Sequence, residues 1–271
     1  MIIIGEKING TIPSVKKAIA ERNADFIMKR AVSQTEAGAG FIDVCASTSA
    51  DEEYDALKWL IETVQQATEL PLCVDSPNEF LLKRIFEEGL VNKPGMLNSV
   101  NEEGTKCETI FPLIAGTPWQ VIGLTCDKDG IPDKNDKKIE IAKRMIDKAD
   151  KYGVALENFH IDPCVMALST RPTAQLDFEE CIRRIKEYAP AVKITGAISN
   201  ISFDMPLRKI VNQNCMAMAI HAGLDSAIMD PTDRDMLGVI FASEALSGKD
   251  TSGRKFNRAY RKGIIGPKNQ A

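Results

Sequence analysis

The sequence lacks the short motifs that mark several common enzyme classes. None of GxSxG, the phosphate-binding P-loop or HExxH occurs in its 271 residues, so nucleophilic hydrolysis and nucleotide-driven transfer have no support. Only two histidines are present, His160 and His221, and neither has a cysteine or an acid at zinc-ligand spacing. We therefore expect both histidines to be structural, and we expect no bound metal.

We also expect no targeting or membrane-spanning segment in the chain. It opens with Met-Ile-Ile-Ile-Gly-Glu, without the basic region of a signal peptide, and no apolar run reaches the length of a membrane span. Seven cysteines are scattered without any CxxC pair, which predicts reduced, mostly buried thiols. These features predict a cytoplasmic protein with no membrane contact.

Charge is divided unevenly along the chain. The net charge is −4, but the segment 248–271 carries six more basic than acidic side chains, which leaves −10 for residues 1–247. Because nucleic-acid binding requires a basic surface, an acidic body argues against it. We predict a barrel domain over 1–247 and a basic tail over 248–271 that is a solvated helix or a frayed end. The basic residues of the tail are Lys249, Arg254, Lys255, Arg258, Arg261, Lys262 and Lys268.

Short apolar runs rich in strand formers alternate with longer amphipathic stretches from one end of the chain to the other. This alternation indicates βα units around a parallel sheet, and no linker interrupts it. The fold class is therefore α/β, and eight runs fit a single (β/α)8 TIM barrel. The predicted strands cover 1–6, 40–46, 71–75, 95–99, 120–125, 159–162, 193–199 and 225–230.

Two of the intervening stretches show clear helical periodicity. One places Tyr54, Leu57, Leu60, Ile61 and Val64 on a single face. The other covers 137–152, with apolar residues at helical spacing.

Polar side chains close most of the predicted strands. In a (β/α)8 barrel the chemistry lies at the carboxyl ends of the strands, so such residues are candidates for a site. Asp and Asn at these positions can also cap the next helix, and this alternative is strong at Asp230-Pro231. The candidates are Glu6, Asn9, Asp43, Asp75, Asn98, Asp127, Asp162, Asn200 and Asp230.

Carboxylates and carboxamides that converge on one pocket suit a ligand with alternating N–H donors and carbonyl acceptors. A pterin edge has this pattern, and so does a nucleobase or an amidine. A hard metal ion is a further possibility, but nothing in the spacing marks one. Lys193 does not fit a Schiff-base role, because it begins a strand and so lies away from the mouth.

Seven segments together resemble the methyltetrahydrofolate:corrinoid methyltransferases, pterin-binding barrels similar to dihydropteroate synthase and to the folate module of cobalamin-dependent methionine synthase. They are IIIGEKING, FIDV, LCVDS, MLNS, IGLTCDKDGIP, IDP and AISNISF, and the resemblance covers residues 1 to about 245. It is greatest to the methylcobalamin:tetrahydrofolate enzymes that serve corrinoid-dependent demethylation.

The resemblance implies a set of roles. Asp75, Asn98 and Asp162 would hold the pterin ring, and Asn200 would lie near N5 as the catalytic residue. Glu6, Asn9 and Asp43 would lie in the same mouth. The substrate would be tetrahydrofolate, the cobalt would arrive on a separate corrinoid protein, and the enzyme would be a homodimer that forms 5-methyltetrahydrofolate.

Two departures from the family pattern stand out. Cys45 replaces an asparagine that relatives carry, and the segment from Phe203 to Arg208 is short and apolar, which leaves the role of Arg208 open.

Two alternative functions also remain. One is a dihydropteroate synthase, although NGTIPSV after the first strand does not look like its anion-binding loop; the other is a non-catalytic folate-binding module that docks a corrinoid protein.

Overall fold

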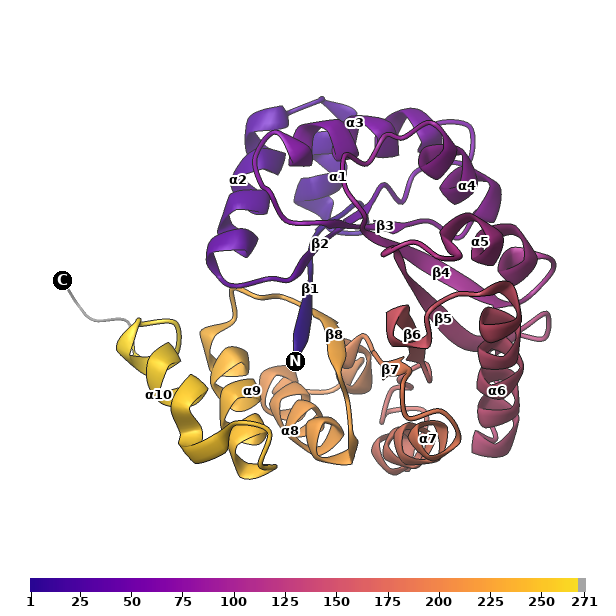
Figure 1. The fold of residues 1–271 in the computed structure, drawn as a ribbon. Helices are drawn as coiled ribbons and strands as arrows, with labels where there is room; N and C mark the ends of the chain where they lie inside the picture. The colour runs from indigo at the N-terminus through magenta and orange to yellow at the C-terminus, as the bar shows by residue number, and fades with distance from the viewer. Residues whose placement is uncertain (268–271) are drawn as a thin grey trace.

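The structure is a computed structural model that describes residues 1–267. Eight parallel strands form one sheet in the order β7-β6-β5-β4-β3-β2-β1-β8, and helices surround it (Figure 1). The predicted α/β class and (β/α)8 barrel are confirmed.

The strands are β1 (Ile2–Asn9), β2 (Phe41–Cys45), β3 (Leu72–Asp75), β4 (Met96–Glu102), β5 (Gln120–Asp127), β6 (Phe159–Asp162), β7 (Lys193–Ile194) and β8 (Ser226–Met229). The helices are α1 (Pro13–Ala20), α2 (Ala24–Glu36), α3 (Glu53–Gln65), α4 (Glu79–Glu87), α5 (Lys106–Ile114), α6 (Asn135–Tyr152), α7 (Ala174–Tyr188), α8 (Arg208–Ala222), α9 (Arg234–Leu246) and α10 (Arg254–Arg261). Three short 3-10 helices are η1 (Leu156–Asn158), η2 (Ile198–Ser202) and η3 (Thr251–Gly253).

The barrel closes between β7 and β8 through a few backbone hydrogen bonds. The N–H of Asp225 donates to the carbonyl of Ile194 at 3.0 Å, and the N–H of Ile228 donates to the carbonyl of Gly196 at 3.1 Å. All eight strands therefore contribute to one closed interior.

The seventh strand is shorter than the predicted run 193–199. Only Lys193–Ile194 pairs regularly, and Ile198–Ser202 forms η2 instead. A Cβ on Gly196 would lie 2.9 Å from the ring of Phe178, so α7 packs directly on the backbone where the strand leaves the sheet. The early end of this strand allows η2 to fold over the mouth of the barrel.

The barrel interior is layered because successive strand residues point to opposite faces. Its middle layer is an apolar cluster of Ile4, Phe41, Cys73, Met96 and Ile122. Two residues further along their strands, the inward positions are Glu6, Asp43, Asp75 and Asn98. The barrel interior is thus apolar in its middle layer and polar at the carboxyl ends of the strands, which form the mouth.

The helices bury their apolar stripes against the outside of the sheet. The stripe predicted on α3 is buried at Leu57, Leu60, Ile61 and Val64, while Tyr54 is half-buried. The stripe predicted over 137–152 is buried on α6 at Ile139, Ile141, Ala142, Met145, Ile146 and Ala149. Both predicted helices are confirmed.

The basic tail packs against the barrel as far as the structure describes it. The carboxylate of Asp250 accepts hydrogen bonds from the N–H groups of Lys255 and Phe256 at the start of α10. Ala259 and Ile265 are buried, and α10 lies beside α9 (Figure 1). The segment is helical at α10, its described basic side chains are exposed, and Lys268 lies outside the described residues. No helix within residues 1–267 combines the length and the apolar composition that a membrane crossing requires.

Candidate active site at the barrel mouth

Six of the seven predicted site residues line one cavity at the mouth. The cavity measures about 360 Å³, within the usual range of roughly 300–1,000 Å³ for small-molecule sites. Its walls are Glu6, Lys7, Asn9, Thr11, Ile12, Asp43, Asp75, Asn98, Ala197, Ser199, Asn200 and Ile228. Segments far apart in the chain therefore meet at the carboxyl ends of the strands.

Asp162 is the one predicted residue that is not among the lining residues. It ends β6 and is buried, with only 6% of its surface exposed. Its carboxylate accepts a hydrogen bond from the backbone N–H of Cys164 at 2.7 Å. Burial raises the pKa of Asp162 to about 6, against the effect of this hydrogen bond and of the Lys138 ammonium.

Asp43 and Asp75 are carboxyl groups of the cavity wall whose pKa values are raised by burial. One oxygen of Asp43 is buried without a partner among residues 1–267. Burial raises the pKa of Asp43 well above its ordinary value, and the charge of Asp75 adds to this effect. Burial also raises the pKa of Asp75 to about 6, although a hydrogen bond with the Cys45 thiol acts in the opposite direction. Such acids gain most from a ligand that brings N–H donors.

The turn after β1 places Asn9 at the rim. Its side-chain oxygen accepts hydrogen bonds from the backbone N–H and the hydroxyl of Thr11, at 2.9 and 2.7 Å, so it shapes this turn. A Cβ on Gly10 would lie 1.9 Å from the carbonyl oxygen of Ala46, and only glycine fits there. Asn9 thus combines a turn-forming role with a place in the cavity wall.

Arg208 holds the turn that carries Asn200. Its guanidinium donates to the Ser202 hydroxyl at 3.0 Å and to the Ser199 carbonyl at 2.9 Å. It also lies 5.0 Å from the centre of the Phe203 ring. The carboxamide of Asn200 makes no hydrogen bond with another side chain in the described part of the chain. Asn200 is therefore fixed by its backbone and left available to a ligand.

Lys7 brings a positive charge to the cavity wall, and an acid already neutralises it. Its ammonium lies 3.0 Å from the carboxylate of Asp230. Burial and the charge of Asp230 raise the pKa of Glu6, while Lys7 and Arg208 act in the opposite direction. The mouth is consequently acidic overall.

The sequence reasoning missed Lys138, a buried lysine next to the site. Its ammonium donates to the carbonyls of Pro163 and Cys164, the two residues that follow Asp162. A signal was present, because Lys138 precedes Ile141, Ala142 and Met145 at helical spacing and so lies on the buried stripe of α6.

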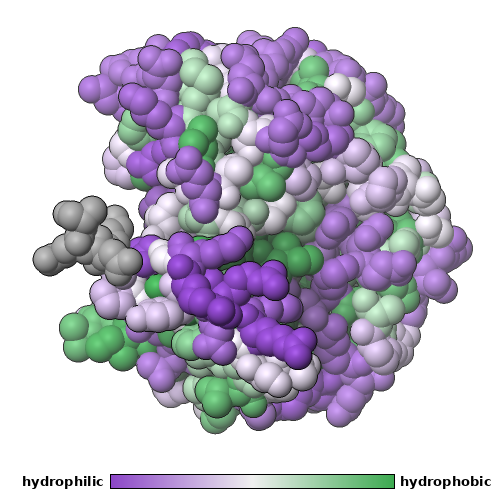
Figure 2. All heavy atoms as spheres, turned by 60° about the vertical axis from the view of Figure 1, so that its left-hand side comes forward, coloured by the Kyte–Doolittle hydropathy of each residue, from purple (hydrophilic) through white to green (hydrophobic). Residues whose placement is uncertain are grey.

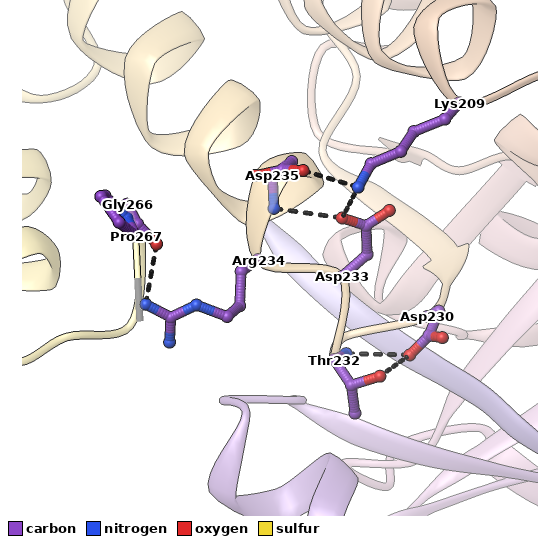
Figure 3. Close-up of a pocket in the computed structure, with 8 residues that line it drawn as sticks. All are labelled: Lys209, Asp230, Thr232, Asp233, Arg234, Asp235, Gly266 and Pro267. Carbon is purple, nitrogen blue, oxygen red and sulfur yellow. Dashed lines mark hydrogen bonds and ion pairs between the residues drawn. The ribbon is translucent and has the colours of Figure 1, made fainter. Parts of the chain in front are cut away.

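A second hollow, of about 510 Å³, lies beside the mouth where α9 begins (Figure 3). Lys209 pairs there with Asp235 at 2.6 Å, and the guanidinium of Arg234 donates to the carbonyl of Gly266 at 2.9 Å. The carboxylate of Asp233 caps α9. Because these charged groups partner one another, this hollow is a weaker candidate than the cavity that holds Asp43.

The two histidines lie away from the cavity lining. His160 is fully buried, and its ring nitrogens lie 2.8 Å from the Ser226 hydroxyl and 2.7 Å from the Gln120 side-chain oxygen. Burial lowers the pKa of His160 to about 3. His221 is exposed in the last turn of α8.

Comparisons with known proteins bear on this site. Residues 5–230 match the family described as pterin binding enzyme. A methylcorrinoid:tetrahydrofolate methyltransferase of Eubacterium limosum is 50% identical over 269 residues, which are 98% of each chain.

More distant relatives share the barrel. A methionine synthase of Mycobacterium tuberculosis is 29% identical over 84% of this chain, but the match covers only 20% of that protein. Dihydropteroate synthase structures from Vibrio fischeri and Xanthomonas albilineans superpose with TM-scores of 0.68 and 0.65 at 14% and 17% identity. These matches cover 92% and 90% of this chain, and 94% and 92% of the two solved chains. The chain belongs to the pterin-binding enzyme family.

Proposed function

We propose that this chain is a methyltransferase that moves a methyl group from the cobalt of a methylcorrinoid to N5 of tetrahydrofolate and so forms 5-methyltetrahydrofolate. The observation that carries the proposal is a mouth of buried acids in which one oxygen of Asp43 has no hydrogen-bond partner among residues 1–267, in a chain that is 50% identical to a methylcorrinoid:tetrahydrofolate methyltransferase. A pterin edge offers N–H groups that such an oxygen can accept.

Asp75, Asn98 and Asp162 would hold the pterin ring. The raised pKa values of Asp75 and Asp162, both about 6, leave these acids ionised at neutral pH and ready to accept N–H donors. Asn98 can donate and accept, which suits an edge with both kinds of group. Glu6, Asn9 and Asp43 complete the wall around the ring.

Asn200 would act at N5. When bound, a methylcorrinoid would supply the methyl group, with the electron pair of the carbon–cobalt bond left on the cobalt. N5 would take the methyl group with its lone pair, become positively charged and then lose its proton to water. The side-chain oxygen of Asn200 can accept a hydrogen bond from this N–H, and the bond strengthens as the charge develops. The other residues of the mouth orient the ring, because no side chain there offers covalent chemistry.

A dihydropteroate synthase activity fits the mouth less well. That reaction needs groups that bind a pyrophosphate, and the cation in the cavity wall, Lys7, is already paired with Asp230. The dihydropteroate synthase structures are 12–17% identical to this chain and show the shared fold alone.

An assay with methylcobalamin and tetrahydrofolate tests the proposal. We expect the visible spectrum of the methylated cobalt to be lost and 5-methyltetrahydrofolate to appear in equal amount. Folate binding without any change at cobalt would support a docking module instead. Formation of dihydropteroate from a pterin pyrophosphate and 4-aminobenzoate would support the other alternative.

We further infer that a separate corrinoid protein brings the cobalt, and that the enzyme is a homodimer. Large apolar side chains are exposed on α8, α9 and α10, among them Ile210, Met218, Leu246 and Tyr260. Figure 2 turns the side of α10 forward and shows apolar patches next to strongly hydrophilic ones. Light scattering should give twice the chain mass, and Leu246→Glu should lower it if this face joins the subunits.

We place the protein in the cytoplasm. All seven cysteines are free thiols, which agrees with a reducing compartment.

A further inference from the structure

Lys138 on α6 is a buried cation, and removing an ammonium from water costs free energy. Only 5% of its surface is exposed, and its ammonium donates to the carbonyl oxygens of Pro163 and Cys164 at 2.8 and 3.0 Å. Both hydrogen-bond partners of this ammonium within residues 1–267 are backbone carbonyls, and neither is a carboxylate. A buried ammonium without an ion-pair partner needs a compensating role, since an apolar side chain would pack on α6 at lower cost.

The two carbonyls belong to the loop that shapes the end of β6. Cys164 has φ +58°, in the left-handed region, and in this conformation its N–H meets the carboxylate of Asp162 at 2.7 Å. Pro163 cannot donate a hydrogen bond, so the loop has few bonds of its own. Lys138 therefore stabilises, by hydrogen bonds, the short segment that orients the Asp162 carboxylate.

The same ammonium also acts on the charge of Asp162. Burial raises the pKa of this acid to about 6, and Lys138 is the charged side chain that opposes the rise. Three thiols also lie around the loop. A hydrogen bond with Cys126, together with burial, raises the pKa of Cys164, so it stays neutral, and the same contact lowers the pKa of Cys126 to about 7. Burial raises the pKa of Cys181, on α7 near Lys138, to about 11.

We propose that Lys138 is a positioning residue for folate recognition, which fixes both the direction and the negative charge of the Asp162 carboxylate from outside the cavity. This inference rests on the proposed function, since it assumes that Asp162 accepts N–H groups of the pterin. An ionised carboxylate can accept two such bonds, whereas the protonated acid presents a hydrogen where the ligand also has one.

The test is the pH dependence of tetrahydrofolate affinity, measured by calorimetry between about pH 5 and 9. The wild type should lose affinity as the pH falls through about 6, because Asp75 and Asp162 both take up a proton there. In Lys138→Met this loss should move upward by about one pH unit, since an opposite charge at this range shifts a carboxyl by about that much. Affinity should then be about twofold weaker at pH 7 and about tenfold weaker near pH 5, where most of the carboxylate is protonated.

Two variants separate this role from packing alone. Lys138→Arg keeps the charge and should restore the wild-type profile. Lys186→Met is the control, because Lys186 also donates to a backbone carbonyl, that of Val192, but it pairs with Asp225 and lies before β7 at the other end of the barrel. It should leave the profile unchanged even where it lowers the melting temperature. If Lys138→Met does not fold, Lys138→Gln keeps a donor without the charge and should show the same shift.

A Lys138→Met profile that coincides with the wild type would overturn the inference and leave the proposed function intact. Wild-type protein that binds no tetrahydrofolate at any pH would overturn both.

Discussion

The two ends of the barrel interior treat buried polar groups in opposite ways. At the amino-terminal end, His160 is matched on both ring nitrogens by Ser226 and Gln120. At the carboxyl end, Asp43 keeps a buried oxygen without a partner, and burial raises the pKa of Asp75 to about 6. The apolar layer between them keeps the two sets apart.

The polar residues at the amino-terminal end of the interior therefore serve stability, and those at the carboxyl end serve ligand binding. A satisfied network stabilises the fold and gains nothing from a ligand. Acids that lack donors destabilise the empty protein and are stabilised when a ligand supplies them. Substitutions at the two ends should therefore affect different measurements.

The largest effect is expected at the mouth. Asn200→Ala should lower the rate of methyl transfer by about 10²-fold or more, because it removes one preorganised hydrogen-bonding group that acts in the transition state. Tetrahydrofolate affinity should fall much less. Single-turnover kinetics and calorimetry measure the two quantities, and Asn214→Ala on the surface of α8 is a control. An unchanged rate would remove Asn200 from the mechanism.

The opposite end should give the opposite pattern. His160→Ala leaves the Ser226 hydroxyl and the Gln120 amide without their partner, and should lower the free energy of unfolding by about 2 kcal/mol. Neither folate affinity nor the rate of methyl transfer should change at a temperature where the variant is folded. Urea unfolding measures the first effect. A rate that falls in a folded variant would contradict the division between the two ends.

Asp75→Asn should weaken folate binding and stabilise the empty protein. Loss of the charged acceptor should reduce affinity about tenfold. The raised pKa of Asp75 means that its contribution to stability is fully present below about pH 4 and is lost as the pH rises through about 6. The variant should therefore unfold at a higher temperature than the wild type at neutral pH, and the two should converge in acid. An affinity equal to the wild type would refute the assigned role.

The sequence was sufficient for the barrel and for most of its mouth, because both follow from local rules. Alternation along the strands puts Glu6, Asp43, Asp75 and Asn98 on the inward face. In the sequence they are recognised as polar residues near the ends of apolar strand segments. The strand over 193–199 was predicted too long, since contact between Gly196 and α7 is a tertiary effect. Lys138 hydrogen-bonds the loop after β6, and Arg208 hydrogen-bonds η2. Both interactions join separate elements, so no local sequence pattern predicts them.

Cys45 gives the smallest expected effect. Its thiol hydrogen bond lowers the pKa of Asp75, so Cys45→Ala should raise that pKa above about 6 and leave less of the anion at neutral pH. Folate affinity should fall about threefold, the scale of one weak hydrogen bond. Cys45→Asn supplies a stronger donor and should bind at least as tightly as the wild type. Cys107→Ala, which removes a buried thiol on α5, should leave affinity unchanged. If Cys45→Ala bound folate like the wild type, the thiol would have no part in setting the charge of Asp75.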